Sequence, residues 1–260
     1  MPEPLLMRYM QPLITGRRAE CFRLISEALA DGAVAEDLIC DILWPSMLQI
    51  DRLYRDDRIN MAVEHMASRI NRAVADQLQA RLRQEPPNGK RLMVICSPGD
   101  QEELGASIAA DLLQADGWEV YLLGGGVPND EILNMVGQLR PEVLLIFGTR
   151  PEDVPETRKL VEMIREINVC PTMNIVVSGG IYNRADGLWQ EVGADVFTPA
   201  LRELRAVLRT LPPRQPGAPR VGLVKKRRRR RKAATAGAAA PGAPTPTAPH
   251  TARQRAWVGT

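Results

Sequence analysis

The stretch LMVICSPGDQEELG, residues 92–105, decides the fold of this chain. Its apolar run at 92–96 predicts a buried strand, and the loop that follows opens into a helix at about residue 103. Glu103 stands three positions after Asp100, which is the spacing of a capping box. Carboxylates at a helix N-terminus stabilise the helix by about 0.3 to 1 kcal/mol each. Helix capping therefore accounts for these two acids without any ligand.

Apolar runs and helical stretches alternate along the chain from this point. The runs lie at 92–96, 119–123, 143–147, 174–177 and 195–197, and the helical stretches at 103–115, 129–139, 154–167, about 184–191 and 200–211. This alternation predicts an α/β domain over 86–211, with a doubly wound parallel five-stranded sheet of flavodoxin-like order. Such a sheet binds ligands at the carboxyl ends of its strands, beside the first strand.

The preceding part of the chain has the apolar period of helices. Apolar residues recur at helical spacing between residues 17 and 84, with breakers at Gly16, Gly32 and near Asn60. Together with the apolar patch at 4–14, they predict an antiparallel bundle of three or four helices over 1–85. The sequence EPPNG at 85–89 then predicts a linker.

Charge is distributed unevenly over the 260 residues. Residues 212–260 hold 12 Lys or Arg and no Asp or Glu, which leaves 22 basic against 31 acidic residues in 1–211. This tail is rich in Pro, Ala and Arg, so we expect it to be disordered. Its run KKRRRRRK, from Lys225 to Lys232, predicts a nucleic-acid or acidic partner, or a solubilising tail without a fixed partner.

The cysteines and the apolar runs indicate the cellular compartment of the protein. The four cysteines are far apart and form no C-x-x-C pair, a pattern typical of buried thiols under reducing conditions: Cys21, Cys40, Cys96 and Cys170. Every apolar run is too short for a secretory segment or a membrane span. We therefore expect a cytoplasmic protein with no membrane association.

The loop at 99–105 resembles the first strand–loop–helix unit of the cobalamin-binding domain family, which has an acidic residue, any residue, His, two more residues and Gly. Asp100 and Gly105 match this pattern, and Glu102 takes the place of the histidine, which in the family is the lower axial ligand to cobalt. A carboxylate is a harder, oxygen-donating ligand than imidazole. The run GWEVYLLGGGVP at 117–128 continues the resemblance, which covers about residues 17–211.

The helical part resembles the cap of light-sensing and methyltransferase-type cobalamin domains. In the light sensors a Trp is followed ten positions later by Glu-His, and here Tyr54 takes the Trp position before Glu64 and His65. The resemblance implies that Tyr54 and Glu64 cover the upper face of the corrin and that His65 reaches cobalt. A helix histidine paired with a neighbouring acid is the alternative. His65 is the only histidine in 1–211, which excludes a multi-histidine metal site there.

The resemblance also implies a lower pocket that holds the nucleotide tail of the cofactor. After the third strand, where the family has Ser-x-Leu, this chain has Phe147, Gly148 and Thr149, so the hydroxyl that helps to hold the tail is absent or displaced to Thr149. The family's paired glycines after the fourth strand are present as Gly179 and Gly180, which follow Ser178. Glycines at strand ends equally indicate tight turns. Gly124 to Gly126 lacks the G-x-G-x-x-G spacing of nucleotide sites, and the third strand ends without the acceptor Asp of a phosphoryl receiver.

These observations predict a cobalamin-binding protein without enzymatic activity of its own. The favoured function is a corrinoid-binding or corrinoid-derived sensor or adaptor in signalling or transcriptional regulation. The first alternative is a corrinoid carrier for a separate methyltransferase, where the cofactor performs the chemistry. The second is a degenerate domain that binds no cobalamin, because fold alone does not decide function.

Overall fold

A computed structural model describes residues 4–97 and 103–216 of the chain. Residues 4–79 form only helices: α1 (Leu5–Ile14), α2 (Arg18–Ala30), α3 (Ala35–Leu38), the π-helical turn η1 (Ile39–Leu43), α4 (Trp44–Arg55) and α5 (Met61–Gln79). The predicted breakers separate these helices. Gly16 and Gly32 take positive φ angles of 71° and 93°. Asn60 caps α5, since its side-chain oxygen accepts a hydrogen bond from the Val63 N–H at 3.0 Å.

The elements α3, η1 and α4 form one continuous helical segment with a widened turn in its middle. Proline lacks an N–H, and its ring clashes with the carbonyl four residues earlier in an α-helix. Pro45 is the second residue after the π-helical turn, so the wider turn accommodates it. The bundle therefore has four helical segments. The π-helical turn lies within the third segment and sets the direction in which the Trp44 side chain projects from it.

The second part is the predicted α/β unit. Its strands are β1 (Arg91–Cys96), β2 (Glu119–Gly124), β3 (Val143–Phe147), β4 (Asn174–Ser178) and β5 (Val196–Phe197), all parallel in the order β2-β1-β3-β4-β5. This is the flavodoxin-like order, so the prediction of a doubly wound parallel five-stranded sheet is confirmed. The strands β1, β3 and β4 are almost wholly buried, as parallel strands covered on both faces are.

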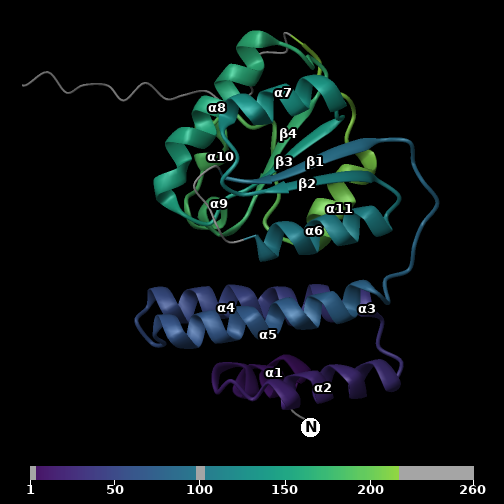
Figure 1. Cartoon of the computed structure of the whole chain (residues 1–260), viewed down its shortest axis with the longest axis vertical. Helices are drawn as coiled ribbons and strands as arrows, with labels where there is room; N and C mark the ends of the chain where they lie inside the picture. The colour runs from purple at the N-terminus through teal and green to yellow at the C-terminus, as the bar shows by residue number, and fades with distance from the viewer. Residues whose placement is uncertain (1–3, 98–102, 217–260) are drawn as a thin grey trace, which may run out of the picture. The chain divides into compact units, whose positions relative to one another are not determined.

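Helices cover both faces of the sheet (Figure 1). One face carries α6 (Leu104–Ala115) and α11 (Leu201–Thr210), and its side chains share an apolar core with the helical bundle. The other face carries α7 (Asn129–Leu139) and α8 (Val154–Ile167), which follows the short 3-10 turn η2 (Pro151–Asp153), and has a core of its own. The bundle therefore packs against the α6 and α11 side of the sheet.

Two details differ from the sequence-based expectation. The helix expected at about 184–191 is two short helices, α9 (Gly180–Arg184) and α10 (Leu188–Glu191), because Gly187 takes a positive φ of 78° between them. Pro212 and Arg214, assigned to the tail by composition, bind the α/β unit. The Pro212 carbonyl accepts from Asn174 Nδ2 at 2.9 Å, and Arg214 Nε donates to Asp195 Oδ1 at 3.1 Å. The rest of the predicted tail, including residues 225–232, lies outside the described residues.

Candidate functional site

Strands β1, β3 and β4 end at one edge of the sheet, and several predicted site residues meet there. Gly179 directly follows β4 with a φ of 105°, and a Cβ on it would lie 2.5 Å from the Gly148 carbonyl oxygen. Only glycine fits this turn. Ser178 is buried, and its hydroxyl donates to the Thr198 carbonyl at 2.9 Å, so that hydroxyl is engaged with the segment after β5.

Trp44 covers the first turn of α6 at this edge. A Cβ on Gly105 would lie 3.5 Å from the Trp44 ring, and the ring meets Phe147 edge-on with centroids 6.3 Å apart. Trp44 is 6% exposed, and its indole N–H has no hydrogen-bond partner among the described residues. Sequence analysis did not name Trp44 as a site residue. Its indole ring, ten residues before Tyr54, was the signal that could have identified a second aromatic site residue in the cap.

Arg184 spans the same edge from α9 to the cap. Its Nη1 lies 3.2 Å from Asp51 Oδ2 on α4, and its other terminal nitrogen donates to the Thr149 carbonyl. A Cβ on Gly180 would lie 2.7 Å from Arg184 Nη1. Burial lowers the pKa of Arg184, and the Asp51 charge acts in the opposite direction. The predicted positions Thr149 and Gly180 are therefore both contacted by this guanidinium.

The start of α5 extends past the start of α6. Gln79 Nε2 donates to Asp111 Oδ1 at 3.0 Å, and the chain then follows the end of α6, where the Glu85 N–H donates to the Ala115 carbonyl. The two helices therefore run in the same direction. At 1.5 Å per residue His65 lies roughly 21 Å before Gln79, whereas α6 begins only about 10 Å before Asp111. The start of α5, where His65 lies, consequently extends roughly 10 Å beyond the start of α6.

The three predicted cap residues flank the turn between α4 and α5. Tyr54 is 38% exposed near the end of α4, and the His65 side chain is 67% exposed in the second turn of α5. His65 Nε2 lies 3.6 Å from Glu64 Oε2, and Glu64 Oε1 accepts from the Ser68 hydroxyl at 2.7 Å. Glu64 is thus held in place beside an imidazole that is open to a ligand.

The loop that opened the sequence argument is described only from Glu103 onward. Asp100 and Glu102 lie outside the described residues. Glu103 directly precedes α6, and its side chain makes no cap hydrogen bond to the described part of that helix. Its Oε1 accepts from the Gly125 N–H at 2.9 Å, and a Cβ on Gly124 would lie 2.4 Å from that oxygen. Glu103 therefore stabilises the turn after β2, and the capping box with Asp100 stays a prediction, because Asp100 lies outside the described residues.

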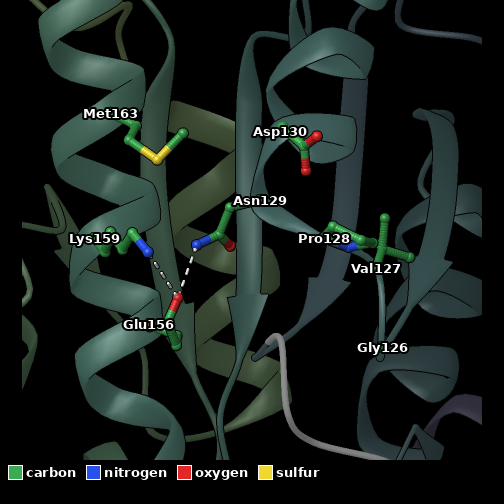
Figure 2. A pocket seen from close by; sticks show the side chains of 8 residues that line it. All are labelled: Gly126, Val127, Pro128, Asn129, Asp130, Glu156, Lys159 and Met163. Carbon is green, nitrogen blue, oxygen red and sulfur yellow. Dashed lines mark hydrogen bonds and ion pairs between the residues drawn. The ribbon is translucent and has the colours of Figure 1, made fainter.

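A pocket of about 440 Å³ opens beside the same turn (Figure 2). Its floor is the start of α7, and α8 forms one wall. Asn129 Nδ2 donates to Glu156 Oε2 at 3.2 Å, and Lys159 Nζ lies 3.7 Å from the same oxygen. Lys159 balances the charge of Glu156, and none of the predicted cofactor-binding residues lines this pocket.

A corrin ring already supplies four nitrogens to cobalt, so the protein needs to add only an axial donor. His65 fits this requirement, because its imidazole is exposed and Glu64 lies beside it. Within residues 4–97 and 103–216, no three His, Cys, Asp or Glu side chains form a metal site of their own. The α/β edge fits a corrin less directly, since Trp44 and Arg184 lie against the glycines that would border it.

Comparison with known proteins decides the family. Two different family models, each described as a B12 binding domain, match the chain: one over residues 90–208 in the α/β unit and the other over residues 5–79 in the helical bundle. The chain belongs to the cobalamin-binding (B12-binding) domain family. Both halves of this cobalamin-binding protein are thereby accounted for, and corrinoid binding is supported.

This cobalamin-binding chain spans a different share of the length of each of two curated relatives. Dimethylamine corrinoid protein 3 of Methanosarcina acetivorans is 23% identical over 215 residues, which are 80% of this chain and 97% of that protein. The HTH-type transcriptional repressor CarA of Myxococcus xanthus is 29% identical over 122 residues, which are 47% of this chain and only 41% of the repressor.

A solved structure has the same fold. The monomethylamine corrinoid protein of Methanosarcina barkeri aligns with a TM-score of 0.70 at 19% identity, covering 78% of this chain and 96% of that one. In the described parts of this cobalamin-binding chain, no helix is long and apolar enough to cross a membrane.

Proposed function

We propose that this protein is a corrinoid carrier, which holds a corrinoid between its helical cap and the carboxyl edge of its sheet and presents cobalt to a separate methyltransferase. The match to Dimethylamine corrinoid protein 3 carries this proposal, because it extends over both the cap and the α/β unit and spans 97% of that relative. The sensor or adaptor favoured by the sequence pattern has weaker support, since the match to CarA covers less than half of either chain.

His65 would be the axial ligand in this carrier. The exposure of its imidazole and the neighbouring Glu64 carboxylate support this role, because the ring is accessible to a ligand. Glu64 is a positioning residue: fixed by the Ser68 hydroxyl, it orients the His65 ring. Tyr54 would lie against the corrin rim. The bound corrinoid supplies the cobalt that accepts and releases a methyl group, so the protein contributes binding and orientation.

Entry of the corrin requires the cap to move. Trp44 and the Arg184–Asp51 pair lie between α4 and the strand ends, and a flat ring on Gly105 would need the place of the Trp44 indole. The Trp44 N–H, which lacks a partner among the described residues, would gain one from an amide carbonyl on the corrin periphery. That gain offsets part of the lost packing against Phe147.

Visible absorption after incubation with hydroxocobalamin or methylcobalamin, and after removal of free ligand by gel filtration, tests the proposal. We expect coloured protein, with a cobalt(III) spectrum shifted by imidazole in the hydroxocobalamin sample. His65→Ala should abolish that shift and weaken binding at least tenfold. Arg72→Ala is the matched control, because Arg72 is exposed two turns later on the same stripe of α5. Colourless wild-type protein under all conditions would leave only the degenerate domain.

A regulator remains the second candidate, on the strength of the match to CarA. The two functions differ in what the loaded protein does. A carrier should lose the methyl group of bound methylcobalamin to a thiol only when its methyltransferase is present, with no change of oligomeric state. A regulator should change its oligomeric state with the upper ligand or with light, which size-exclusion chromatography with light scattering detects. The nucleic-acid partner considered for residues 225–232 has no support beyond the charge of that run.

A further inference from the structure

A second pocket, of about 410 Å³, opens at the amino edge of the sheet. Among its lining residues, Lys90 directly precedes β1, Val143 begins β3 and Asn174 begins β4. The strands are parallel, so this edge is opposite the carboxyl edge where the proposed corrin would lie. The volume falls in the range of small-molecule sites, roughly 300 to 1,000 Å³.

The walls of this amino-edge pocket are tied together by the segment after α11. Asn174 Nδ2 donates to the Pro212 carbonyl at 2.9 Å, the Arg214 N–H donates to the Thr172 carbonyl at 2.9 Å, and Arg214 Nη1 donates to the Pro171 carbonyl at 3.2 Å. Three of the lining residues are prolines: Pro141, Pro171 and Pro213. Proline fixes its own φ, so these walls are preformed and need little ordering when a ligand binds.

The floor of the amino-edge pocket is apolar. Trp118 and Val143 are 5% and 2% exposed, and the partly buried Val169 and Leu211 also line it. Cys170 lines the same space and is only partly buried, with its Sγ 3.6 Å from the Val136 carbonyl oxygen. An occupant with an apolar body therefore gains more here than an inorganic ion.

Two cations line the amino-edge pocket without an acidic partner. Neither Lys90 nor Arg140 forms an ion pair with an acid within residues 4–97 and 103–216. Lys90 Nζ lies 5.5 Å from the centroid of the Trp118 ring, so its charge is held beside the apolar floor. The one acid among the described lining residues is Glu142, whose Oε2 accepts from the Arg91 N–H at 2.6 Å.

The positive charge extends to the Cys170 thiol. Burial raises the pKa of Cys170, whereas the charges of Arg140 and then Arg91 lower it, and Glu142 has a smaller effect that raises it. The electrostatic field of the charged side chains around this thiol is therefore net positive. Such a field favours an anionic ligand over a neutral one of the same shape.

We propose that the amino-edge pocket binds a small amphipathic anion, whose apolar body of one or two rings lies on the floor and whose oxyanion group meets Lys90 and Arg140. The guanidinium of Arg140 offers paired donors that match the oxygens of a carboxylate, sulfonate or phosphate, and the Lys90 ammonium adds a point charge. This site goes beyond the proposed corrinoid carrier and does not depend on it, because it lies at the other edge of the sheet.

Fluorescence titration of the full-length protein with anilinonaphthalene sulfonate and with neutral phenylnaphthylamine tests the proposal. The two probes have the same ring system and differ in the sulfonate. We expect the sulfonate to bind at least tenfold more tightly. The double variant Lys90→Gln/Arg140→Gln should weaken the sulfonate at least tenfold and the neutral probe less than twofold. Lys159→Gln is the matched control, because Lys159 lines the pocket beside α7 and pairs with Glu156, so both affinities should stay unchanged.

Cys170 reports whether the probe lies in this pocket. We expect saturating sulfonate probe to slow alkylation of Cys170 by neutral N-ethylmaleimide at least fivefold, as measured by mass spectrometry. Cys170→Ser gives the background from the other three cysteines, which are buried. The cations of residues 217–260 are the same in every variant, so they cancel from the comparison.

Three results would overturn the proposal and leave the proposed corrinoid binding untouched. They are equal wild-type affinities for the two probes, an unchanged sulfonate affinity in a double variant with native circular dichroism, and a Cys170 alkylation rate that the sulfonate does not change. If the double variant does not fold, the probe comparison and the Cys170 protection in the wild type decide.

Discussion

Arg184 on α9 and Asp51 on α4 form an ion pair with Nη1 and Oδ2 3.2 Å apart, although 133 residues separate them in the chain. The pair joins the cap to the segment after β4, where the family's paired glycines stand. Asp51 also pairs with Arg55 of its own helix at 3.0 Å. The Asp51 carboxylate thus pairs with Arg184 on α9 and with Arg55 on α4. Substitution of one arginine removes one of these contacts and keeps the other.

Loss of the Arg184–Asp51 pair should speed corrinoid entry. Both side chains are partly exposed, so the pair is weak, and we expect Arg184→Gln to raise the association rate of hydroxocobalamin by about two- to fivefold. Arg55→Gln, which removes only the contact within α4, should leave the rate unchanged. Stopped-flow absorbance measures both. Equal rates in the wild type and Arg184→Gln would show that this contact does not limit entry.

Asp116 should contribute stability that is lost in acid. Its side chain is 4% exposed and lies 2.6 Å from Arg205 Nη2 and 3.0 Å from Arg209 Nη2. Burial by itself would raise the pKa of Asp116, but the hydrogen bonds and charges of Arg205 and Arg209 lower it overall. A lowered pKa in the folded state gives stability that is present above the unfolded value of about 3.9 and disappears as the pH falls through the folded value.

We therefore expect Asp116→Asn to lower the free energy of unfolding by about 2 kcal/mol at pH 7. The difference from the wild type should shrink as the pH falls below about 4, and it should be lost only below the lowered folded pKa of Asp116, where both chains carry a neutral group. Asp37→Asn is the control, because Asp37 is an exposed partner of Arg202, which also pairs with Asp41. It should cost less than about 1 kcal/mol. Urea unfolding at several pH values measures this, and a pH-independent deficit would contradict the linkage.

The few residues after α11 should matter for stability. Arg214 donates to the Asp195 carboxylate and to the Pro171 carbonyl, and its N–H donates to the Thr172 carbonyl. A chain that ends at Leu211 loses these bonds, whereas one that ends at Pro216 keeps them. We expect the shorter chain to be about 1 to 3 kcal/mol less stable, with a Tm several degrees lower. Differential scanning calorimetry compares them, and equal melting temperatures would show that the bonds contribute nothing.

Glu102→His should place an imidazole at the lower position implied by the family resemblance. The test uses cobalt(II) cobinamide in a His65→Ala background, so that neither the cofactor base nor His65 can supply nitrogen. We expect Glu102→His to introduce three-line superhyperfine splitting in the electron paramagnetic resonance spectrum, which becomes two-line in ¹⁵N-labelled protein. His65→Ala alone should show neither. A spectrum without nitrogen splitting in both proteins would remove position 102 from the lower face.

The element pattern was predictable because it is encoded locally. The strand and helix periods and the breakers at Gly16, Gly32 and near Asn60 all act within a few residues, and the structure confirms them. The helix expected at 184–191 failed for an equally local reason, the positive φ of Gly187. The predicted roles of Tyr54, Glu64 and His65 remain predictions, although the structure leaves the His65 imidazole exposed beside Glu64.

Local pattern in the chain was enough to specify the helical bundle, the parallel sheet and its order, and the family to which both belong. It could not specify how the carboxyl edge is filled. Trp44 on Phe147, Arg184 on Asp51 and Tyr182 beside Gly148 are contacts between segments far apart in the chain. Such contacts depend on how the cap packs on the sheet and on which side chains fill the space above glycines, and neither leaves a period or a spacing in the sequence. Only the tertiary structure decides them.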